Sequence, residues 1–123
     1  MLKQSDFQRI ASLVRTTDSE MAQMLEEELN RAFIVEDNKL APEVVTMNSR
    51  VKFREIESGK ELSITLTYPE ESNLEENHIS VLAPVGAALI GLSVGQRIEW
   101  PFPNGKQRTL EVLSVAQPVE IRM

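Results

Sequence analysis

The first part of the chain has apolar residues at helical spacing, three or four positions apart. A first helix is predicted over residues 5–14, where Ser5 and Gln8 have the spacing of a capping box at its start. Its apolar positions form a single stripe, which is expected to face the core: Phe7, Ile10, Ala11 and Val14.

A second helix is predicted over residues 18–35, where Thr17 and Glu20 make another capping box. Few residues separate the two helices, so they are expected to pack antiparallel as a coiled-coil hairpin over residues 1–36. The arm is short, because about 17 helical residues span only about 26 Å. The residues expected on the buried side of the second helix are Met21, Met24, Leu25, Leu29, Ala32 and Phe33.

A polar stretch that includes a proline, residues 37–43, is interpreted as a hinge, and after it the apolar period changes from helical to two. Residues 45–53 and 62–68 alternate between apolar and polar side chains, as half-buried strands do. The turn residues at 58–60 lie between them, so the two strands are expected to pair antiparallel.

The next segment, residues 69–77, carries four glutamates and is interpreted as a solvated loop before a short strand at 79–82. Pro84 is well placed as the first residue of a helix, and Gly91 as its C-terminal stop. This helix is the only one expected after the hinge.

The last part of the chain has the pattern of a hairpin. Ile98 and Trp100 lie on one side of a strand, and the pair Asn104-Gly105 favours a tight turn. A final strand through Leu110 and Val112 precedes a tail that begins at Pro118. The pattern as a whole predicts an α+β protein with a helical hairpin followed by an antiparallel sheet of four or five strands.

Composition narrows the function classes. The chain has 123 residues, enough for one domain, and a hydrophobic content of 41% excludes a disordered protein. The absence of cysteine removes disulfides, thiolate catalysis and cysteine zinc sites. A net charge of −6 disfavours direct nucleic-acid binding, which usually needs a basic surface. With no apolar signal core and no stretch of roughly 20 apolar residues, the chain is expected to be cytosolic and away from membranes.

Candidate chemistry is sparse. The lone histidine, His78, forms no multi-histidine metal site, and the glycines follow no phosphate-binding pattern. Asp18 and Glu20 stand out because they fall at the predicted hairpin tip, where they either act as ligands or simply complement the dipole of the second helix and cap it. No catalytic residue, metal site or cofactor is predicted.

Two runs carry a resemblance to a known family. Val44-Val45-Thr46-Met47-Asn48-Ser49-Arg50-Val51 and Leu82-Ala83-Pro84-Val85-Gly86-Ala87-Ala88-Leu89-Ile90-Gly91-Leu92 resemble the C-terminal module of the Gre transcript-cleavage factors. In amino-acid sequence the two runs are still more similar to the regulator of nucleoside diphosphate kinase (Rnk) family. The resemblance covers most of the chain.

The Gre resemblance implies that residues 44–123 have an FKBP-like fold and dock on RNA polymerase at the rim of its secondary channel. An FKBP-like fold also raises the possibility of prolyl isomerase activity, but the second unit has too few aromatic residues for an obvious proline pocket. It places the contact at the loop entering the short helix, where Ala83, Pro84 and Val85 stand in this chain. Pro84 and Val85 either present an apolar knob or merely start the helix and fill the core. Asn48 and Arg50, on the expected polar face of the first strand, serve either binding or solvation.

In Gre factors an acidic hairpin tip enters the channel and helps to hold a catalytic magnesium. The tip of this chain, Thr17 with Asp18 and Glu20, has a different acid spacing and stands on a shorter arm. The resemblance therefore implies a regulator that competes with Gre-type factors for polymerase without cleavage, and the chain is expected to be a monomer. The alternatives are a cleavage-stimulating factor that uses Asp18 and Glu20, and a regulator of nucleoside diphosphate kinase that acts through another protein.

Overall fold

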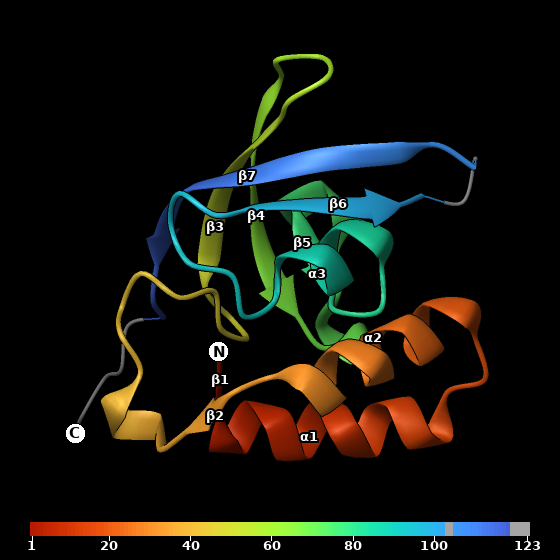
Figure 1. Ribbon diagram of the computed structural model, residues 1–123, viewed down its shortest axis with the longest axis vertical. Helices are drawn as coiled ribbons and strands as arrows, with labels where there is room; N and C mark the ends of the chain where they lie inside the picture. Colours follow the sequence, from red (N-terminus) through yellow and green to blue (C-terminus); the bar gives the residue numbers. More distant parts are fainter. Residues whose placement is uncertain (103–104, 119–123) are drawn as a thin grey trace.

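The computed structural model describes residues 1–102 and 105–118, which form a mixed α+β structure with two N-terminal helices beside a curled sheet (Figure 1). The helices are α1 (Gln4–Thr16) and α2 (Glu20–Arg31), and they run in opposite directions next to each other. The strand order in the sheet is β5-β4-β3-β7-β6. Its strands are β3 (Arg50–Glu55), β4 (Glu61–Thr67), β5 (His78–Ser80), β6 (Arg97–Pro101) and β7 (Gln107–Ala116).

The predicted antiparallel pairing of the first two sheet strands is confirmed. Val51 pairs with Ile64 across β3 and β4, and Phe53 pairs with Leu62. Gly59, with φ of 73°, lies in the turn between them, where the backbone conformation suits a residue without a Cβ. Burial alternates along β3, so one face of the strand joins the core and the other meets solvent.

The expectation of a wholly antiparallel sheet is wrong, because β5 pairs parallel to β4. The segment between them contains two short 3₁₀ helices, η2 (Pro69–Glu71) and η3 (Leu74–Glu76). This segment brings the chain back as far as Thr65, so that β5 runs beside the last three residues of β4 in the same direction. The predicted loop at 69–77 is therefore an ordered crossover.

Strands β6 and β7 form the predicted antiparallel hairpin, and β7 also pairs with β3. At their connection, Gly105 N donates to Phe102 O at 3.0 Å, while Asn104 of the predicted Asn-Gly turn lies outside the described residues. The beginning of the predicted tail, Pro118, is the last residue that the structure describes.

Helix α2 is shorter than predicted and ends at Arg31, because the chain turns extended at Ala32. Residues Ile34–Val35 form β2, which pairs parallel with β1 (Leu2–Lys3) in a separate two-stranded sheet. Phe33, expected on the buried side of the helix, is instead 78% exposed. The early end of the helix rotates this side chain out of the apolar stripe.

The predicted capping box at the first helix is also wrong. Lys3 is the N-cap residue of α1, and the Ser5 hydroxyl and amide both donate to Asp37. Asp37 belongs to a 3₁₀ helix, η1 (Asp37–Lys39), inside the segment predicted as a hinge. Farther along this segment, Pro42 O accepts from Gln117 Nε2 at 2.9 Å. Both ends of the connecting segment are thus tied to other parts of the chain.

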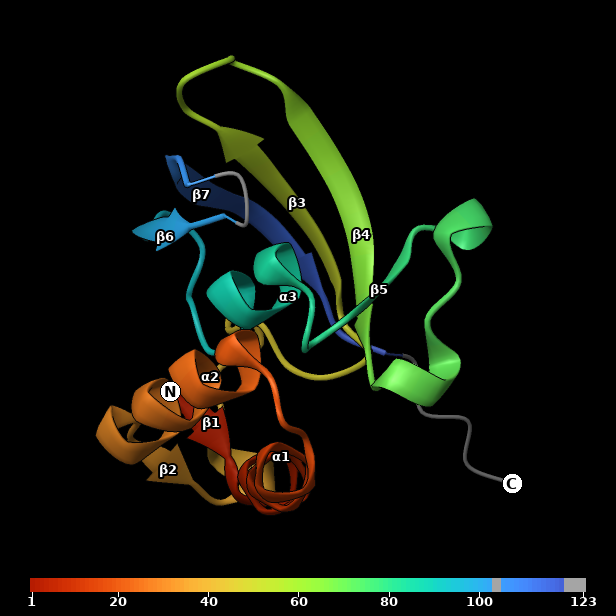
Figure 2. The same ribbon diagram turned by 90° about the vertical axis from the view of Figure 1, so that its right-hand side faces the viewer.

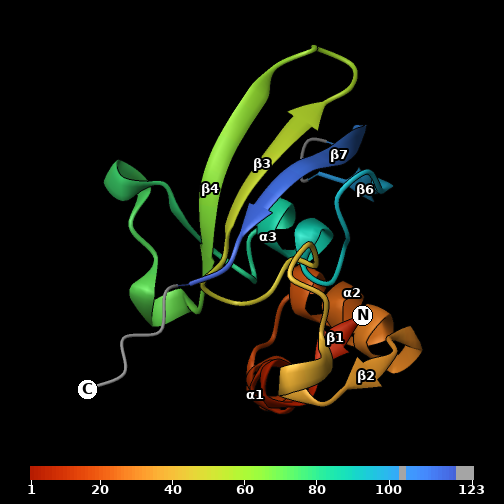
Figure 3. The same cartoon turned by 90° about the vertical axis from the view of Figure 1, so that its left-hand side faces the viewer.

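The short helix α3 (Pro84–Leu89) lies in the hollow of the curled sheet, as Figures 2 and 3 show from two sides. It lies between the sheet and α2, and its Ala87, Ala88 and Leu89 are buried in one core with Leu25 and Leu29 of α2. The two N-terminal helices and the sheet therefore share a continuous hydrophobic core rather than forming separate ones.

Candidate protein-docking surface

The entrance to α3 has the geometry predicted for it. Pro84 occupies the first turn, and the Ala83 carbonyl accepts the first helical hydrogen bond from Ala87 N at 2.9 Å. Ala83 has no side-chain cap, since a methyl group stands where a hydroxyl would accept a further bond. A Cβ at Gly86 would lie 2.2 Å from Ser80 O, so only glycine lets α3 approach β5 this closely.

A groove of about 510 Å³ brings the hairpin tip and the start of α3 together. One wall comes from the first turns of α2 and the other from the end of β6, which lie on the same side of the molecule (Figure 1). The described residues that line the groove are mostly apolar: Glu20, Met21, Met24, Pro84, Pro101, Phe102 and Gly105. Glu20 and Pro84, both singled out from the sequence, therefore share one site.

The cap at the hairpin tip is Ser19, not the predicted Thr17. The Ser19 side chain accepts from Ala22 N at 3.1 Å, while the Thr17 hydroxyl donates back to Leu13 O at 2.9 Å. Asp18 and Glu20 are exposed, and neither carboxylate is the cap of α2. Their charges are thus directed to solvent at the tip.

The first resemblance motif folds as a turn, not as the predicted strand, and β3 begins only at Arg50. The Ser49 hydroxyl donates to Thr46 O at 2.7 Å and accepts from Thr46 N at 3.2 Å. Asn48 has a left-handed backbone with φ of 66°, which asparagine tolerates better than most residues. Asn48 is therefore exposed on a turn rather than on the polar face of a strand.

This turn receives α1. Met47 N donates to Asp6 Oδ2 at 3.0 Å, and Asp6 is only 6% exposed. Burial raises the pKa of the Asp6 carboxyl, while the hydrogen bond from Met47 opposes that rise. The sequence reading missed Asp6, although its position four residues before Ile10 places it on the apolar stripe. The signal that could have revealed it is a carboxylate on an apolar helix stripe, where burial calls for a hydrogen-bond partner.

A second contact fixes α1 against the sheet. The Arg9 guanidinium lies 3.6 Å from the ring centroid of Tyr68 and donates to Glu70 Oε1 at 2.7 Å. Burial, helped by the negative charge of Asp6, raises the pKa of the Tyr68 phenol to about 12. The orientation of the helices relative to the sheet is therefore set by hydrogen bonding, ion pairing and ring contact together.

Arg50 lies apart from the groove. Its neighbour Val51 is fully buried toward α3, so Arg50 points to the opposite, convex face of the sheet. Farther along that face Lys52 and Arg54 both pair with Glu61, at 3.3 and 2.9 Å. Arg50 has no such partner among the described residues. The structure does not bring Arg50 and Pro84 together.

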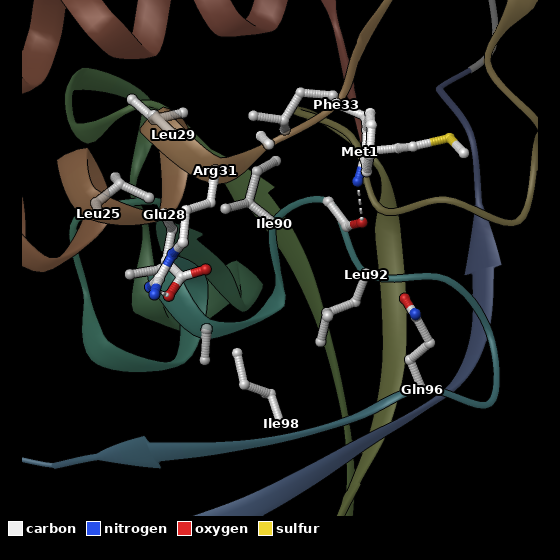
Figure 4. A pocket seen from close by; sticks show the side chains of 15 residues that line it. Met1, Leu25, Glu28, Leu29, Arg31, Phe33, Ile90, Leu92, Gln96 and Ile98 are labelled. Atoms are coloured by element: carbon white, nitrogen blue, oxygen red, sulfur yellow. Dashed lines mark hydrogen bonds and ion pairs between the residues drawn. The ribbon is translucent and has the colours of Figure 1, made fainter.

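A smaller cavity of about 240 Å³ lies between α2, α3 and β6 (Figure 4). Leu25, Leu29 and Ile98 contribute its apolar wall, and Glu28 and Arg31 form an ion pair at its edge. The cavity lies at the boundary between the helices and the sheet, and it adds no reactive group there.

Other chemistry is limited. His78 stands at the entrance to β5, as predicted, with Nε2 3.9 Å from Glu76 Oε2. Across residues 1–102 and 105–118, no three histidine, aspartate or glutamate side chains converge as a metal-ligand group. No helix in the same part of the chain is long and apolar enough to cross a membrane.

The structure is thus a pair of helices joined to a curled sheet, with a mostly apolar groove beside two exposed carboxylates. The family model described as "Transcription elongation factor, GreA/GreB, C-term" matches residues 40–117, and the chain belongs to this family. The match includes both resemblance motifs, the turn that receives α1 and the start of α3.

Individual relatives agree with this assignment. A protein from Escherichia coli K12, named "Regulator of nucleoside diphosphate kinase", is 45% identical over 95 residues, which are 77% of this chain and 70% of that protein. The elongation factor GreA of Syntrophomonas wolfei is 36% identical over 66% of this chain and 51% of its own length. The chain thus spans about half of that GreA protein.

Solved structures give the same fold. A GreA/GreB elongation factor from Nitrosomonas europaea is 40% identical and superposes with a TM-score of 0.77 over 95% of this chain and 97% of the other. The GreA homologue Gfh1 of Thermus thermophilus, at 24% identity, has a TM-score of 0.52 over 94% of this chain and 97% of the other, a likeness of fold alone.

Proposed function

We propose that this protein is a transcription regulator that binds RNA polymerase beside the secondary channel, in the bacterial cytoplasm. It competes there with Gre-type factors and does not stimulate transcript cleavage. The sheet half, residues 44–123, is proposed to have the FKBP-like fold and to dock on the polymerase. The helical part, residues 1–36, is joined to it by the segment 37–43.

The observation that carries the proposal is the short helical pair attached to a sheet half of the GreA/GreB family. Helix α2 has 12 residues and is therefore about 18 Å long. Leu25 and Leu29 bury one side of it against α3, so the pair lies along the sheet rather than projecting from it. An arm of this length and placement covers an entrance but does not reach deep into a channel.

The docking surface is proposed to centre on Ala83, Pro84 and Val85. Pro84 lines the groove, while Val85 is half-buried against the core, so the same short segment both starts α3 and faces outward. Arg50 and Asn48, which are exposed elsewhere, are proposed as secondary contacts. The acidic character of the chain suits a basic protein surface better than nucleic acid.

Binding to core polymerase tests the proposal. Labelled protein at micromolar concentration is expected to co-elute with core polymerase and to be displaced by a Gre factor in a concentration-dependent way. A Gre factor labelled in the same manner serves as the positive control. Failure to co-elute while the Gre control binds removes the proposal, and simultaneous binding of both factors removes its competitive part.

A cleavage-stimulating role is a second candidate, favoured by one observation. Because Ser19 caps α2, the carboxylates of Asp18 and Glu20 remain exposed at the tip, where oxygen ligands for magnesium would be needed. RNA cleavage in a backtracked complex distinguishes the two candidates. Cleavage by the wild type that is lost in the Asp18→Ala/Glu20→Ala double variant supports this role, whereas equal, background-level cleavage rules it out.

The name of the Escherichia coli relative motivates a third candidate, in which the chain acts on nucleoside diphosphate kinase through another protein. A pull-down that offers core polymerase and the kinase side by side separates this candidate from the first. Recovery of polymerase alone supports the transcriptional role.

A further inference from the structure

We propose that helix α2 forms half of the docking site: the groove between α2 and the end of β6 receives an apolar side chain of the polymerase that stands next to a lysine or arginine. This inference rests on the proposed function and extends it. The helical pair then contributes binding energy directly, in addition to covering the channel entrance.

The lining of the groove fits an apolar side chain. Met21 and Met24 form the α2 wall, Pro101 and Phe102 the opposite wall, and Pro84 lies between them. All five are half-buried rather than exposed, so they present apolar surface without filling the groove. Methionine side chains are flexible and polarisable, and they adapt to the shape of an inserted group.

The charge around the groove indicates what accompanies that side chain. Glu20 lines the groove, and Asp18 lies two residues before it, both exposed and without an ion-pair partner among the described residues. Behind the other wall, Arg108 stands over the Phe102 ring and already pairs with Glu55. An unneutralised acidic rim on an apolar groove favours a basic protein segment and repels nucleic acid.

Contacts of α1 with the sheet half hold the α2 wall of the groove in place. Asp6 anchors α1 to the turn at Met47, and Arg9 anchors it to Tyr68 and Glu70. Helix α2 packs between α1 and α3, so these contacts also fix the distance from α2 to Pro84. A site that is already formed before binding loses less conformational entropy when its partner arrives.

The test compares the affinity of four variants for core polymerase. Met21→Ser removes apolar lining and is expected to weaken binding about tenfold, the size of effect typical of a central interface residue. Glu20→Lys reverses the rim charge and is expected to weaken binding about fivefold at low salt, with a smaller effect at high salt. The matched controls are Leu62→Ser, on the distant β3–β4 hairpin, and Glu26→Lys, exposed on the side of α2 that points away from Glu20 and Met24. Both controls should stay within about twofold of the wild type.

The outcomes separate this inference from the proposed function. If the wild type binds polymerase and both groove variants bind equally well, α2 is not part of the site, although the proposed function stands. If the wild type does not bind polymerase, the proposed function and this inference both fail. Thermal unfolding checks that Met21→Ser is folded. If it is not, Glu20→Lys, a change at an exposed residue, decides whether the groove is part of the site. A wild type that self-associates, with Glu20→Lys abolishing that association, shows that a second copy occupies the groove and overturns the inference.

Discussion

The contact between Asp6 and Met47 offers a sharp test of how the helices are attached to the sheet. Two substitutions at Asp6 separate the role of its oxygen atom from the role of its charge. Asp6→Ala removes the acceptor and leaves Met47 N–H buried without a partner. Asp6→Asn keeps an acceptor of the same shape in the same place and removes the charge.

An orphaned buried N–H costs about 1–3 kcal/mol. Alanine recovers about 0.5 kcal/mol of this through its higher helix propensity, since Asp6 lies within α1. Asp6→Ala is therefore expected to lower the free energy of unfolding by about 0.5–2.5 kcal/mol. At about 4 °C per kcal/mol for a chain of this size, the melting temperature falls by about 2–10 °C. Asp6→Asn is expected to match or exceed the stability of the wild type at neutral pH.

Thermal and urea unfolding followed by circular dichroism measure both variants, with Glu27→Ala as a control for loss of an exposed acid on a helix. Asp6→Ala should melt several degrees below Glu27→Ala. The reasoning is refuted if Asp6→Asn is as unstable as Asp6→Ala, because the charge and not the acceptor would then matter. It is also refuted if Asp6→Ala is as stable as the wild type.

The pH dependence of the same pair has a definite sign. Burial raises the pKa of Asp6 above its ordinary value of 3.8, so the folded protein holds this proton more tightly than the unfolded chain does. The stability contributed by protonated Asp6 is full below that value and is lost as the pH rises through the folded-state pKa. The melting temperature of Asp6→Asn minus that of the wild type should therefore grow from pH 3.5 upward and then level off. A difference that shrinks over this range contradicts the assignment.

Three further predictions concern the packing that positions the groove. Gly86→Ala is expected to destabilise the protein by about 2 kcal/mol despite the gain in helix propensity, because the new Cβ meets Ser80 O. Urea unfolding measures this loss of stability, and an unchanged stability would contradict the close approach of α3 to β5. Tyr68 is the only tyrosine, so absorbance at the tyrosinate wavelength reports on this residue alone. Its titration midpoint should lie near pH 12 in the folded protein and near the ordinary value of 10 in denaturant, and equal midpoints would contradict the burial of Tyr68. Arg9→Ala is expected to lower the free energy of unfolding by about 0.5–1.5 kcal/mol, because it removes the contacts with the Tyr68 ring and with Glu70. Arg15→Ala, on the same helix, is the control and should change stability by less than about 0.5 kcal/mol. Equal effects of the two changes in thermal unfolding would exclude a specific role for the Arg9 contacts.

The sequence predicted those elements in which local pattern and tertiary packing agree. Ile10 and Val14 are buried as their helical spacing indicated, and the β3–β4 pairing follows from alternation around a glycine turn. The start of α3 at Pro84 follows from the fixed φ of proline, which suits the first turn of a helix.

Other features had no reliable local signal. Val45, Met47 and Ser49 alternate with polar residues as a strand would, but the Ser49 hydroxyl and the left-handed Asn48 close a turn there instead. The strands β1 and β2 have two residues each, too few to produce a detectable period. Their pairing also carries Phe33 out of the helix on which it was predicted to be buried.

The groove could be predicted only in part. The sequence singled out Glu20 and Pro84 separately, one from the hairpin tip and the other from a resemblance motif. Their meeting depends on the close approach of α3 to β5 and on the packing of α2 against α3, both of which join segments far apart in the chain. Met24 and Phe102 carried no signal of their own, because an apolar residue that lines a groove looks like any core residue in sequence.

The placement of β7 has a consequence for how the protein is made. This strand is the last in the chain among the described elements, yet it lies inside the sheet, between β3 and β6. During synthesis β3 and β4 are available early, but β3 keeps an unpaired edge until residues 107–116 have left the ribosome. Such late pairing of distant segments is slow, and an open edge invites association with other chains. Nascent chains that stall before β7 are therefore expected to be the species most in need of a chaperone.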